Sequence, residues 1–400
     1  MQATERGIVE IEDEFRIPLY HKRDIALVRG EGPYLWDAQG KRYLDMMSNY
    51  GVAILGHSHP AVTAAIVEQA GRLVSCHQSF YNDTRAQFSD ALQALLRGTL
   101  RHISFGNSGA EAVEAALKYA RAATGRQRLI STKRAYHGRT FGALSVTGEQ
   151  KHRESFAPLL DCCEQIPFGN LEAARASLTG AAAMIVEPVQ GESGVRAASE
   201  EYLHGLRRIC DDTGALLIYD EVQTAFRTGR TFAFEHSGAA PDIMTLAKPL
   251  ANGLPIGVTV VSSHVASAIP LGSHGSTFGG NPLVCAAGIA TLSVVAEPNF
   301  NRHVSEVGQT FLDRLRAIEH PLIREARGLG LMVAVELKRN ASPVLQCMQH
   351  QGVLAIPAGS TCVRFLPPLI VEEEHLTHAA EVFEEALKTV GEKEEDARCP

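Results

Sequence analysis

The sequence predicts an α/β protein, with a mostly parallel, helix-covered sheet in a large domain and a smaller α+β domain beside it. Between about residues 50 and 280, short apolar runs alternate with helical stretches. The runs recur roughly every thirty residues, the spacing of βαβ units, whose strands lie parallel. The predicted strands cover residues 129–131, 183–186, 216–220, 243–246 and 258–261.

The two ends of the chain have a different pattern. Residues 25–45 alternate apolar and polar side chains between turn sequences, which predicts a small antiparallel meander. After Pro282 come helical stretches and two more strands, 330–337 and 362–366. We therefore expect an N-terminal segment (1–50) that joins the small domain, a large domain (51–282), a C-terminal small domain (283–390) and a frayed polar tail (391–400).

The composition is that of a soluble globular protein and disfavours several kinds of partner. Hydrophobic residues make up 45% of the 400 residues, charged residues 21%, and the net charge is −7. The acidic net charge argues against nucleic acid as a partner. The sequence has no apolar run of eighteen residues, so it predicts no membrane span. The acidic N-terminus has the wrong sign for a signal or transit peptide. Eight cysteines without a C-x-x-C pair predict free thiols in a reducing cytoplasm.

Two short patterns suggest a ligand but are incomplete. His57 and His59 could form a metal pair, yet no third ligand lies near them in the sequence, so we expect a loop and no metal site. Gly328 and Gly330 lack the third glycine of a dinucleotide-binding fingerprint.

Three ionisable side chains end three successive apolar runs: Glu187, Asp220 and Lys248, at spacings of 33 and 28 residues. In an open α/β sheet such strand ends lie along one edge, where ligands bind. A lysine there can form a Schiff base with an aldehyde cofactor. A carboxylate there can keep a pyridinium nitrogen protonated, so that the ring draws electrons. Together Lys248 and Asp220 predict pyridoxal phosphate, whereas either alone is more often a surface side chain or a helix cap.

Two segments offer groups that suit a phosphate. Ser108, Gly109 and Ala110 precede an amphipathic helix over 112–121, whose first N–H groups and dipole attract an anion. Ser276 and Thr277 lie in a glycine-rich loop and offer two hydroxyls. Taken alone, the first segment is more often an ordinary serine cap.

Four further side chains suit a substrate or the cofactor ring. Tyr136 could stack on a flat cofactor, and Arg139 could bind a carboxylate with two N–H groups. Glu192 follows Glu187 in a glycine-rich turn and faces the same strand ends. Arg364 lies in an apolar run, so it needs a partner if buried. A substrate carboxylate and Glu192 are the two candidates.

These motifs, in this order, resemble those of class III (ω-) aminotransferases, which are pyridoxal phosphate enzymes of fold type I. The likeness spans residues 20–390 and rests on NSGAEA, YHGRT, EPVQGE, DEVQT, LAKPLANGLPIG, HGSTFGGNPL and VRFLPP. It is strongest to acetylornithine aminotransferases and to those that act on lysine or ornithine attached to the carrier LysW. The resemblance implies a seven-stranded, mostly parallel sheet and a homodimer with shared active sites.

The resemblance also assigns roles to the candidate residues. Lys248 resembles the Schiff-base lysine that shuttles the α-proton, and Asp220 resembles the partner of the pyridine nitrogen. Arg364 resembles the arginine that takes the α-carboxylate of glutamate or 2-oxoglutarate, with Glu192 as its gate, and Arg139 resembles a donor-binding residue. The other cofactor ligands that it implies are Ser108, Gly109, Ala110, Tyr136, His137, Val222, Gln223 and, from a second subunit, Thr277 with Ser276 beside it on the substrate side.

The sequence departs from the family pattern at the loop 220–229, which reads DEVQTAFRTG. This loop is one glycine shorter than the common DEVQTGFGRTG. The shortening resembles that in glutamate-1-semialdehyde aminomutases. Tyr50 and residues 80–83 are similar to ornithine δ-aminotransferases and could line the donor pocket.

The resemblance implies transfer of the terminal amino group of N-acetylornithine, or of a related N-blocked ornithine or lysine, to 2-oxoglutarate in amino-acid biosynthesis. The blocked donor could be free or held by an amino-group carrier protein. Alternatives are an ornithine δ-aminotransferase, a 4-aminobutyrate-type enzyme, a glutamate-1-semialdehyde-type aminomutase and a non-catalytic protein of the same fold.

Overall fold

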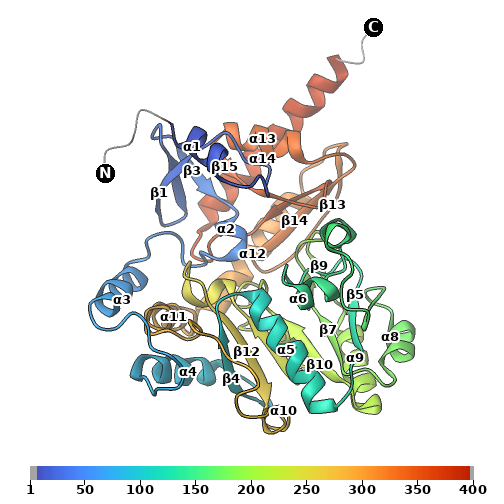
Figure 1. Cartoon of the computed structure of the whole chain (residues 1–400). Coiled ribbons are helices and arrows are strands. Elements are labelled where there is room, and N and C mark those ends of the chain that lie inside the picture. Colours follow the sequence, from blue (N-terminus) through green and yellow to red (C-terminus); the bar gives the residue numbers. More distant parts are fainter. Residues whose placement is uncertain (1–6, 397–400) are drawn as a thin grey trace.

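The computed structural model describes residues 7–396 and contains one large sheet with a smaller α+β part above it (Figure 1). The elements up to residue 166 are α1 Ile8–Phe15, β1 Leu27–Glu31, β2 Tyr34–Asp37, β3 Arg42–Asp45, α2 Ser48–Gly51, α3 Pro60–Ala70, α4 Asp83–Leu95, β4 Leu100–Gly106, α5 Gly109–Thr124, β5 Leu129–Thr132, α6 Phe141–Val146, α7 Gln150–Arg153, η1 Glu154–Phe156 and β6 Cys163–Ile166.

The elements that follow complete the large sheet and build the C-terminal part. They are α8 Leu171–Leu178, β7 Ala183–Val186, β8 Val189–Gln190, β9 Arg196–Ala197, α9 Glu200–Thr213, β10 Leu216–Asp220, η2 Ala233–His236, β11 Ile243–Leu246, η3 Lys248–Ala251, β12 Gly257–Ser262, α10 Ser263–Ser267, α11 Pro282–Val295, α12 Phe300–Arg316, β13 Ile323–Leu329, β14 Met332–Leu337, α13 Ser342–His350, β15 Val353–Leu354, β16 Ile356–Ala358, β17 Cys362–Phe365 and α14 Glu373–Asp396.

The large sheet has seven strands in the order β4-β12-β11-β10-β7-β5-β6. Five of them, β11, β10, β7, β5 and β6, run parallel, whereas β12 is antiparallel to both of its neighbours. The predicted mostly parallel, seven-stranded sheet is therefore confirmed. Every residue of β7, β10 and β11 is buried, as expected for parallel strands with helices on both faces.

The two strands that the apolar pattern missed are the edges of this sheet. Most residues of β4 and β6 are exposed or half-buried, and they include polar side chains such as Arg101, His102 and Glu164. An edge strand faces solvent on one side, so it lacks the continuous apolar run that reveals a central strand.

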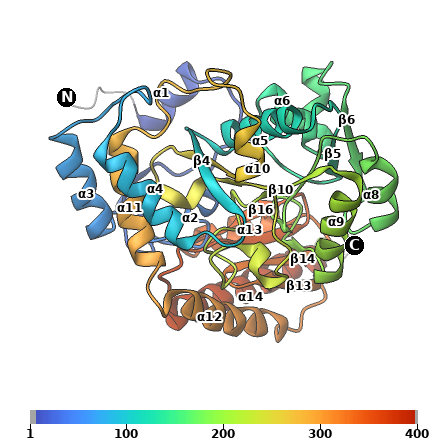
Figure 2. The ribbon, with the colours of Figure 1, turned by 90° about the horizontal axis from the view of Figure 1, so that it is seen from below.

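Helices cover the sheet and fix its strand ends. α3, α4 and α11 lie at one end of the molecule, and α8 and α9 lie at the other (Figures 1 and 2). α5 packs on β10, β11 and β12. Its N-terminus is capped by the Ser108 hydroxyl, which accepts a hydrogen bond from the Glu111 N–H, and it ends at Gly125 in the left-handed conformation. The amphipathic helix predicted from residues 112–121, with Gly109 in its first turn, is confirmed and runs from Gly109 to Thr124.

The smaller part combines both ends of the chain. The meander β1-β2-β3 is completed by β15, which pairs in parallel with β3, and a second sheet has the order β13-β14-β17-β16. This pairing supports the predicted joining of residues 1–50 to the small domain. The predicted strand 330–337 is the second arm of a hairpin, because the chain turns at Gly330 (φ 56°) between β13 and β14.

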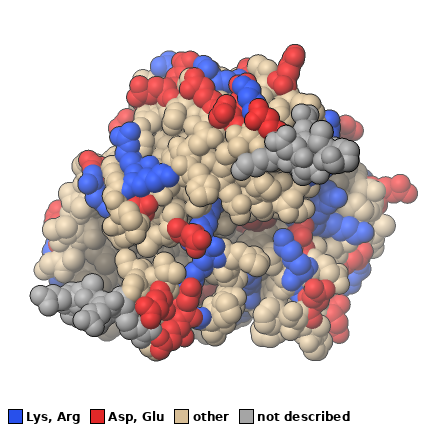
Figure 3. Space-filling model, turned by 90° about the horizontal axis from the view of Figure 1, so that it is seen from above, with Lys and Arg blue, Asp and Glu red and all other residues tan. Residues whose placement is uncertain are grey.

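Two further expectations concern the surface and the C-terminus. The predicted frayed tail begins too early, since α14 continues through Gly391 to Asp396; residues 397–400 lie outside the described part. Within residues 7–396 no single helix could cross a membrane; only α11 and α12 together, bent by 70°, reach the required length and composition. The face seen in Figure 3 carries acidic and basic side chains interspersed, with no extended basic area.

Candidate active site

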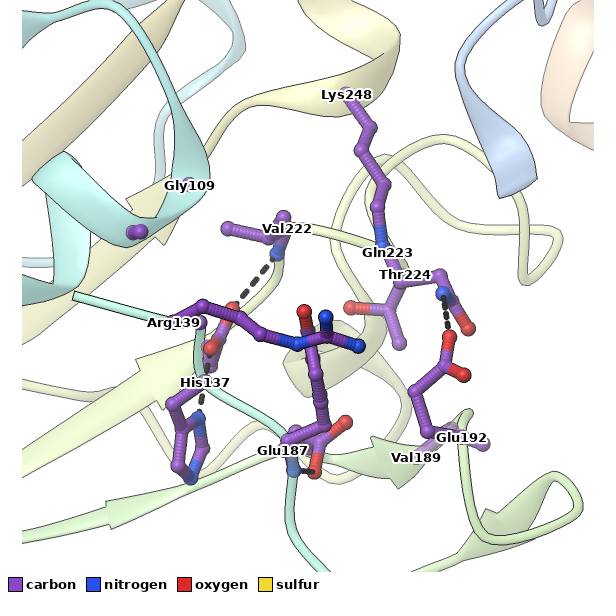
Figure 4. A pocket seen from close by; sticks show the side chains of 14 residues that line it. Gly109, His137, Arg139, Glu187, Val189, Glu192, Val222, Gln223, Thr224 and Lys248 are labelled. Carbon is purple, nitrogen blue, oxygen red and sulfur yellow. Dashed lines mark hydrogen bonds and ion pairs between the residues drawn. The ribbon is translucent and has the colours of Figure 1, made fainter. Parts of the chain in front are cut away.

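The ends of β7, β10 and β11 open into a cavity of about 280 Å³ that brings the three predicted strand-end residues together. Figure 4 shows Lys248 reaching into it from one side, toward Gln223 and Glu192 on the other. The lining residues are Gly109, Ala110, Tyr136, His137, Gly138, Arg139, Glu187, Val189, Glu192, Asp220, Val222, Gln223, Thr224 and Lys248. Most of the predicted cofactor and substrate residues thus share one site with Glu187.

Asp220 is held from three sides at the bottom of the cavity. Its Oδ2 lies 2.7 Å from His137 Nδ1, and its Oδ1 accepts hydrogen bonds from the Val222 N–H and the Thr245 hydroxyl, both at 3.1 Å. Burial alone would lower the pKa of His137, but the hydrogen bond and charge of Asp220 raise it overall. His137 is therefore a positioning residue for Asp220, a role that the sequence did not reveal because 83 residues separate the two.

Glu187 is a buried carboxyl next to this pair. Its Oε2 accepts a hydrogen bond from the Tyr136 N–H at 3.0 Å, which fixes the backbone of the predicted stacking residue. Burial raises the pKa of Glu187 to about 7; the positive charge of His137 opposes that rise, and the negative charge of Asp220 adds to it.

We expect Glu187→Gln to make the stability of the apoenzyme less dependent on pH. Below the ordinary carboxyl pKa the group is protonated in both the folded and the unfolded chain. As the pH rises toward 7 only the unfolded chain ionises, so the free energy of unfolding falls by about 3 kcal/mol between pH 4.5 and 7. Glutamine keeps an oxygen for the Tyr136 N–H but does not titrate.

The measurement is the Tm of the apoenzyme at a series of pH values from 4.5 to 8. The wild type should lose more stability over this range than Glu187→Gln, while the exposed Glu200→Gln should follow the wild type. Equal slopes for the wild type and Glu187→Gln would show that the Glu187 carboxyl ionises normally in the folded chain.

Lys248 lies two residues after the end of β11, at the first residue of the short helix η3. Its amine makes no hydrogen bond or ion pair with any of residues 7–396, so it is available to a ligand. Burial, and to a lesser degree the charge of Arg364, lowers the pKa of Lys248 against the opposing charges of Glu192 and Asp220. A lysine with a lowered pKa is a better nucleophile and base near neutral pH.

The N-terminus of α5 forms one wall of the cavity and fits the predicted phosphate site. A Cβ at Gly109 would lie 2.8 Å from Val222 Cγ1, so glycine is required for this close approach. The N–H groups of Gly109 and Ala110 donate to no acceptor in the described part of the chain, which leaves them for an anion. Ser108, a predicted cofactor ligand, does not line the cavity, and its hydroxyl is used as the helix cap.

A network of polar side chains closes the opposite wall. Arg364 is fully buried, and its Nη1 donates to Glu192 Oε1 at 3.0 Å and to Gln223 Oε1 at 3.1 Å. Gln223 Nε2 donates to Glu192 Oε1 at 3.2 Å. Burial would raise the pKa of Glu192, but Arg364 and Lys248 hold it at about 2, so Glu192 is ionised. Of the two partners predicted for Arg364, the structure has Glu192, and Gln223 lies with this pair.

A second cavity, of about 450 Å³, shares Tyr136, Arg139, Glu192 and Lys248 with the first. We call the first the inner cavity and the second the outer cavity. It also contains Tyr50, whose ring centre is 5.8 Å from the guanidinium carbon of Arg364. The sequence did not point to the other lining residues, because they lie in loops or short elements without a motif: Tyr20, Asn49, Glu149, Lys151, His152, Pro357 and Gly359.

Ser276 and Thr277 do not line either of these two cavities. They lie in a separate polar cavity with Asn107 and Glu111, where the Ser276 hydroxyl accepts a hydrogen bond from Asn107 Nδ2 at 3.0 Å. Within one chain the two residues therefore do not meet Lys248, and the predicted contribution from a second subunit stays a prediction.

Comparison with known proteins identifies the family to which this arrangement belongs. The family model described as aminotransferase class-III matches residues 19–387. The chain belongs to the class III aminotransferases. This class III aminotransferase is 47% identical over 389 residues to the LysW-aminoadipate semialdehyde transaminase of Deinococcus radiodurans, covering 96% of this chain and 91% of that one. It is 39% identical over 397 residues to the acetylornithine aminotransferase of Methanocaldococcus jannaschii, covering 97% and 99%.

Solved structures agree with this assignment. The ornithine aminotransferase from Toxoplasma gondii, whose active site is described as partly occupied by PLP, superposes with a TM-score of 0.92 at 31% identity, covering 98% of this chain and 96% of that one. The predicted family, fold type and cofactor are therefore confirmed: this class III aminotransferase is a pyridoxal phosphate-dependent enzyme with a role in amino-acid metabolism.

Proposed function

We propose that this class III aminotransferase moves the terminal amino group of an N-blocked ornithine or lysine to 2-oxoglutarate, giving the semialdehyde and glutamate. N-acetylornithine and a donor held by an amino-group carrier protein are the two forms that we favour. The observation that supports the proposal most is the buried Arg364, bound to the ionised Glu192 beside Lys248. The names of the relatives from Deinococcus radiodurans and Methanocaldococcus jannaschii point to the same class of donor.

The Glu192–Arg364 pair would let one pocket take two kinds of substrate. While Glu192 neutralises Arg364, a donor with an uncharged chain near its terminal amine fits beside Lys248. When Glu192 moves away, Arg364 is left with a positive charge that an α-carboxylate of 2-oxoglutarate or glutamate can neutralise. Arg139, exposed in the outer cavity, would bind the donor carboxylate.

The remaining residues would act on the cofactor and the reacting carbon. When bound, pyridoxal phosphate supplies an aldehyde and a ring that draws electrons from the substrate. The Gly109 and Ala110 N–H groups would hold its phosphate, Tyr136 would stack on the ring, and Val222 would pack against the other face. Asp220, oriented by His137, would keep a positive charge on the ring nitrogen. The Lys248 amine would take a proton from the substrate carbon and return it.

We also propose a cytoplasmic homodimer in which Thr277 and Ser276 of a second copy complete the phosphate site. In the single chain both residues lie outside the Lys248 cavity. Large apolar side chains of the adjoining segments are exposed and would be covered by that copy: Phe80, Tyr81, Leu271 and Phe278.

A second candidate donor is free ornithine, which Tyr50 favours. Its phenol lines the outer cavity beside Arg364. It could accept a hydrogen bond from a free α-amino group or donate one to it. A blocked donor has no such group to offer, so the two candidates differ at this one contact.

A panel of amino donors assayed with 2-oxoglutarate tests the proposal. We expect kcat/KM for N-acetylornithine or a carrier-linked lysine to exceed that for ornithine by at least about tenfold, the effect of one well-placed polar contact. The reverse ranking would favour the ornithine enzyme. Turnover without 2-oxoglutarate would indicate an aminomutase and contradict the proposal.

A further inference from the structure

A second arginine, Arg227, is fully buried behind the site, and none of the roles above uses it. Its Nη1 donates to the Leu331 and Pro367 carbonyls at 3.1 and 2.9 Å, and its Nη2 donates to the Ser48 hydroxyl at 3.2 Å. Its Nε has no partner. No carboxylate of residues 7–396 lies within ion-pair distance of this guanidinium, so its charge is not neutralised locally.

Arg227 lies near the end of the shortened loop 220–229. Phe226, the residue before it, adopts a left-handed conformation (φ 65°), which a non-glycine residue rarely does. The Arg227 carbonyl then accepts a hydrogen bond from the Leu331 N–H at 3.0 Å. Arg227 is thereby fixed by backbone and side chain to the turn between β13 and β14, four residues after Gln223.

Arg227 also supports the turn that presents Tyr50. Ser48, Asn49 and Tyr50 are all left-handed, with φ of 40°, 51° and 60°. Such a run is strained for residues with a Cβ and persists only where its surroundings hold it. The Ser48 hydroxyl accepts from Arg227 and donates to the Leu366 carbonyl at 2.6 Å, which ties the turn to the strand that carries Arg364.

Among the described residues, one carboxylate, that of Glu192, forms an ion pair with either of the two buried arginines. Arg364 contacts Glu192, but its own Nε and Nη2 have no partner. Burial lowers the pKa of Arg227 to about 9; the charge of Arg364 lowers it further, and that of Asp45 opposes the shift. Asp45 is engaged with His57 Nε2 at 2.7 Å and with the N–H groups of Met47 and Ser48. The two arginines therefore share one paired carboxylate, and Arg364 loses it when Glu192 leaves.

We propose that Arg227 is a positioning residue that makes the site selective for a substrate carboxylate at Arg364, and so strengthens binding of the dicarboxylic acceptor more than that of the amine donor. The inference rests on the proposed function, in which Arg364 takes the α-carboxylate once Glu192 has moved. In the donor half-reaction Glu192 supplies the negative charge. In the acceptor half-reaction the incoming carboxylate must supply it, and the charge of Arg227 favours its arrival.

The test compares Arg227→Met and Arg227→Lys in the holoenzyme. The first readout is the Kd of glutarate, a dicarboxylate that cannot react, measured by calorimetry. The second is the pair of KM values, one for the acceptor 2-oxoglutarate and one for the amine donor. We expect Arg227→Met to raise the Kd of glutarate and the acceptor KM by at least about tenfold, with the donor KM raised less than about threefold. Arg227→Lys, which keeps the charge, should recover most of the glutarate affinity.

Two further variants separate charge from support of the turn. Ser48→Ala keeps both arginines but loosens the Tyr50 turn, so it should affect the donor KM and leave the Kd of glutarate nearly unchanged. If Arg227→Met does not fold, Arg227→Lys carries the test. The inference is then overturned if Arg227→Lys loses as much affinity for glutarate as Arg364→Ala does. Equal effects of Arg227→Met on both KM values overturn it as well. If Arg364→Ala leaves glutarate binding intact, the proposed role of Arg364 is itself wrong.

Discussion

Lys248→Ala is expected to abolish transamination, with kcat at least about 10³-fold below that of the wild type, the range that one general acid–base group supplies. The Lys248 amine lies at the junction of the inner and outer cavities and makes no hydrogen bond or ion pair within residues 7–396. Burial lowers its pKa, which favours the neutral amine. Among the described residues, no other lysine lines the inner cavity.

The attachment of the cofactor gives a readout that does not depend on the substrate. The wild-type protein should be yellow, and borohydride should fix the cofactor to Lys248, where peptide mass analysis finds it. Lys248→Ala should lose that attachment, whereas Lys133→Ala, an exposed lysine outside both cavities, should keep it. An added small primary amine should restore part of the activity of Lys248→Ala if the fold is intact. A yellow, active Lys248→Ala enzyme would exclude the proposed role.

The centre of the site could be predicted because it follows from chain order. Glu187, Asp220 and Lys248 end the strands β7, β10 and β11, and β10 pairs in parallel with both others, so their ends meet at one edge of the sheet. The helix at Gly109 was recognisable for a similar reason, since a serine cap, a glycine and an apolar 3.6-residue period occur together in the sequence.

The other parts of the site depend on contacts between segments that are far apart in the sequence, and a local sequence pattern does not predict such contacts. Arg364 meets Glu192 across 172 residues and Gln223 across 141. Gln223 was predicted to be a cofactor ligand, but its side chain is hydrogen-bonded to Arg364 and Glu192, so its contact with the cofactor stays a prediction. Glu149 and His152, which line the outer cavity, lie at the short helix α7, which has no motif. Arg227 could not be predicted to be buried, because the shortened loop was visible only as a missing glycine.

Asp220→Asn is expected to lower kcat by about 10²–10³-fold, the cost of removing one preorganised electrostatic group from an active site. Asparagine keeps an oxygen for the Val222 N–H and the Thr245 hydroxyl, so the local structure should survive. What is lost is the negative charge opposite His137, and with it the raised pKa of that imidazole. The measurements are kcat for the preferred donor and the pKa of His137, followed by NMR in the wild type and the variant.

Thr245→Val is the matched control, because it removes a hydrogen bond to Asp220 Oδ1 while leaving the charge. If charge at the ring nitrogen is what Asp220 provides, Thr245→Val should lose far less activity than Asp220→Asn. A cofactor analogue methylated at the ring nitrogen carries a permanent positive charge, so it should restore activity to Asp220→Asn but not to Lys248→Ala. Equal losses in Asp220→Asn and Thr245→Val, without rescue by the analogue, would mean that Asp220 acts through shape alone. Lys248→Ala and Asp220→Asn thus test two separate proposed functions: proton transfer by the Lys248 amine, and stabilisation by Asp220 of the charge that makes the proton removable.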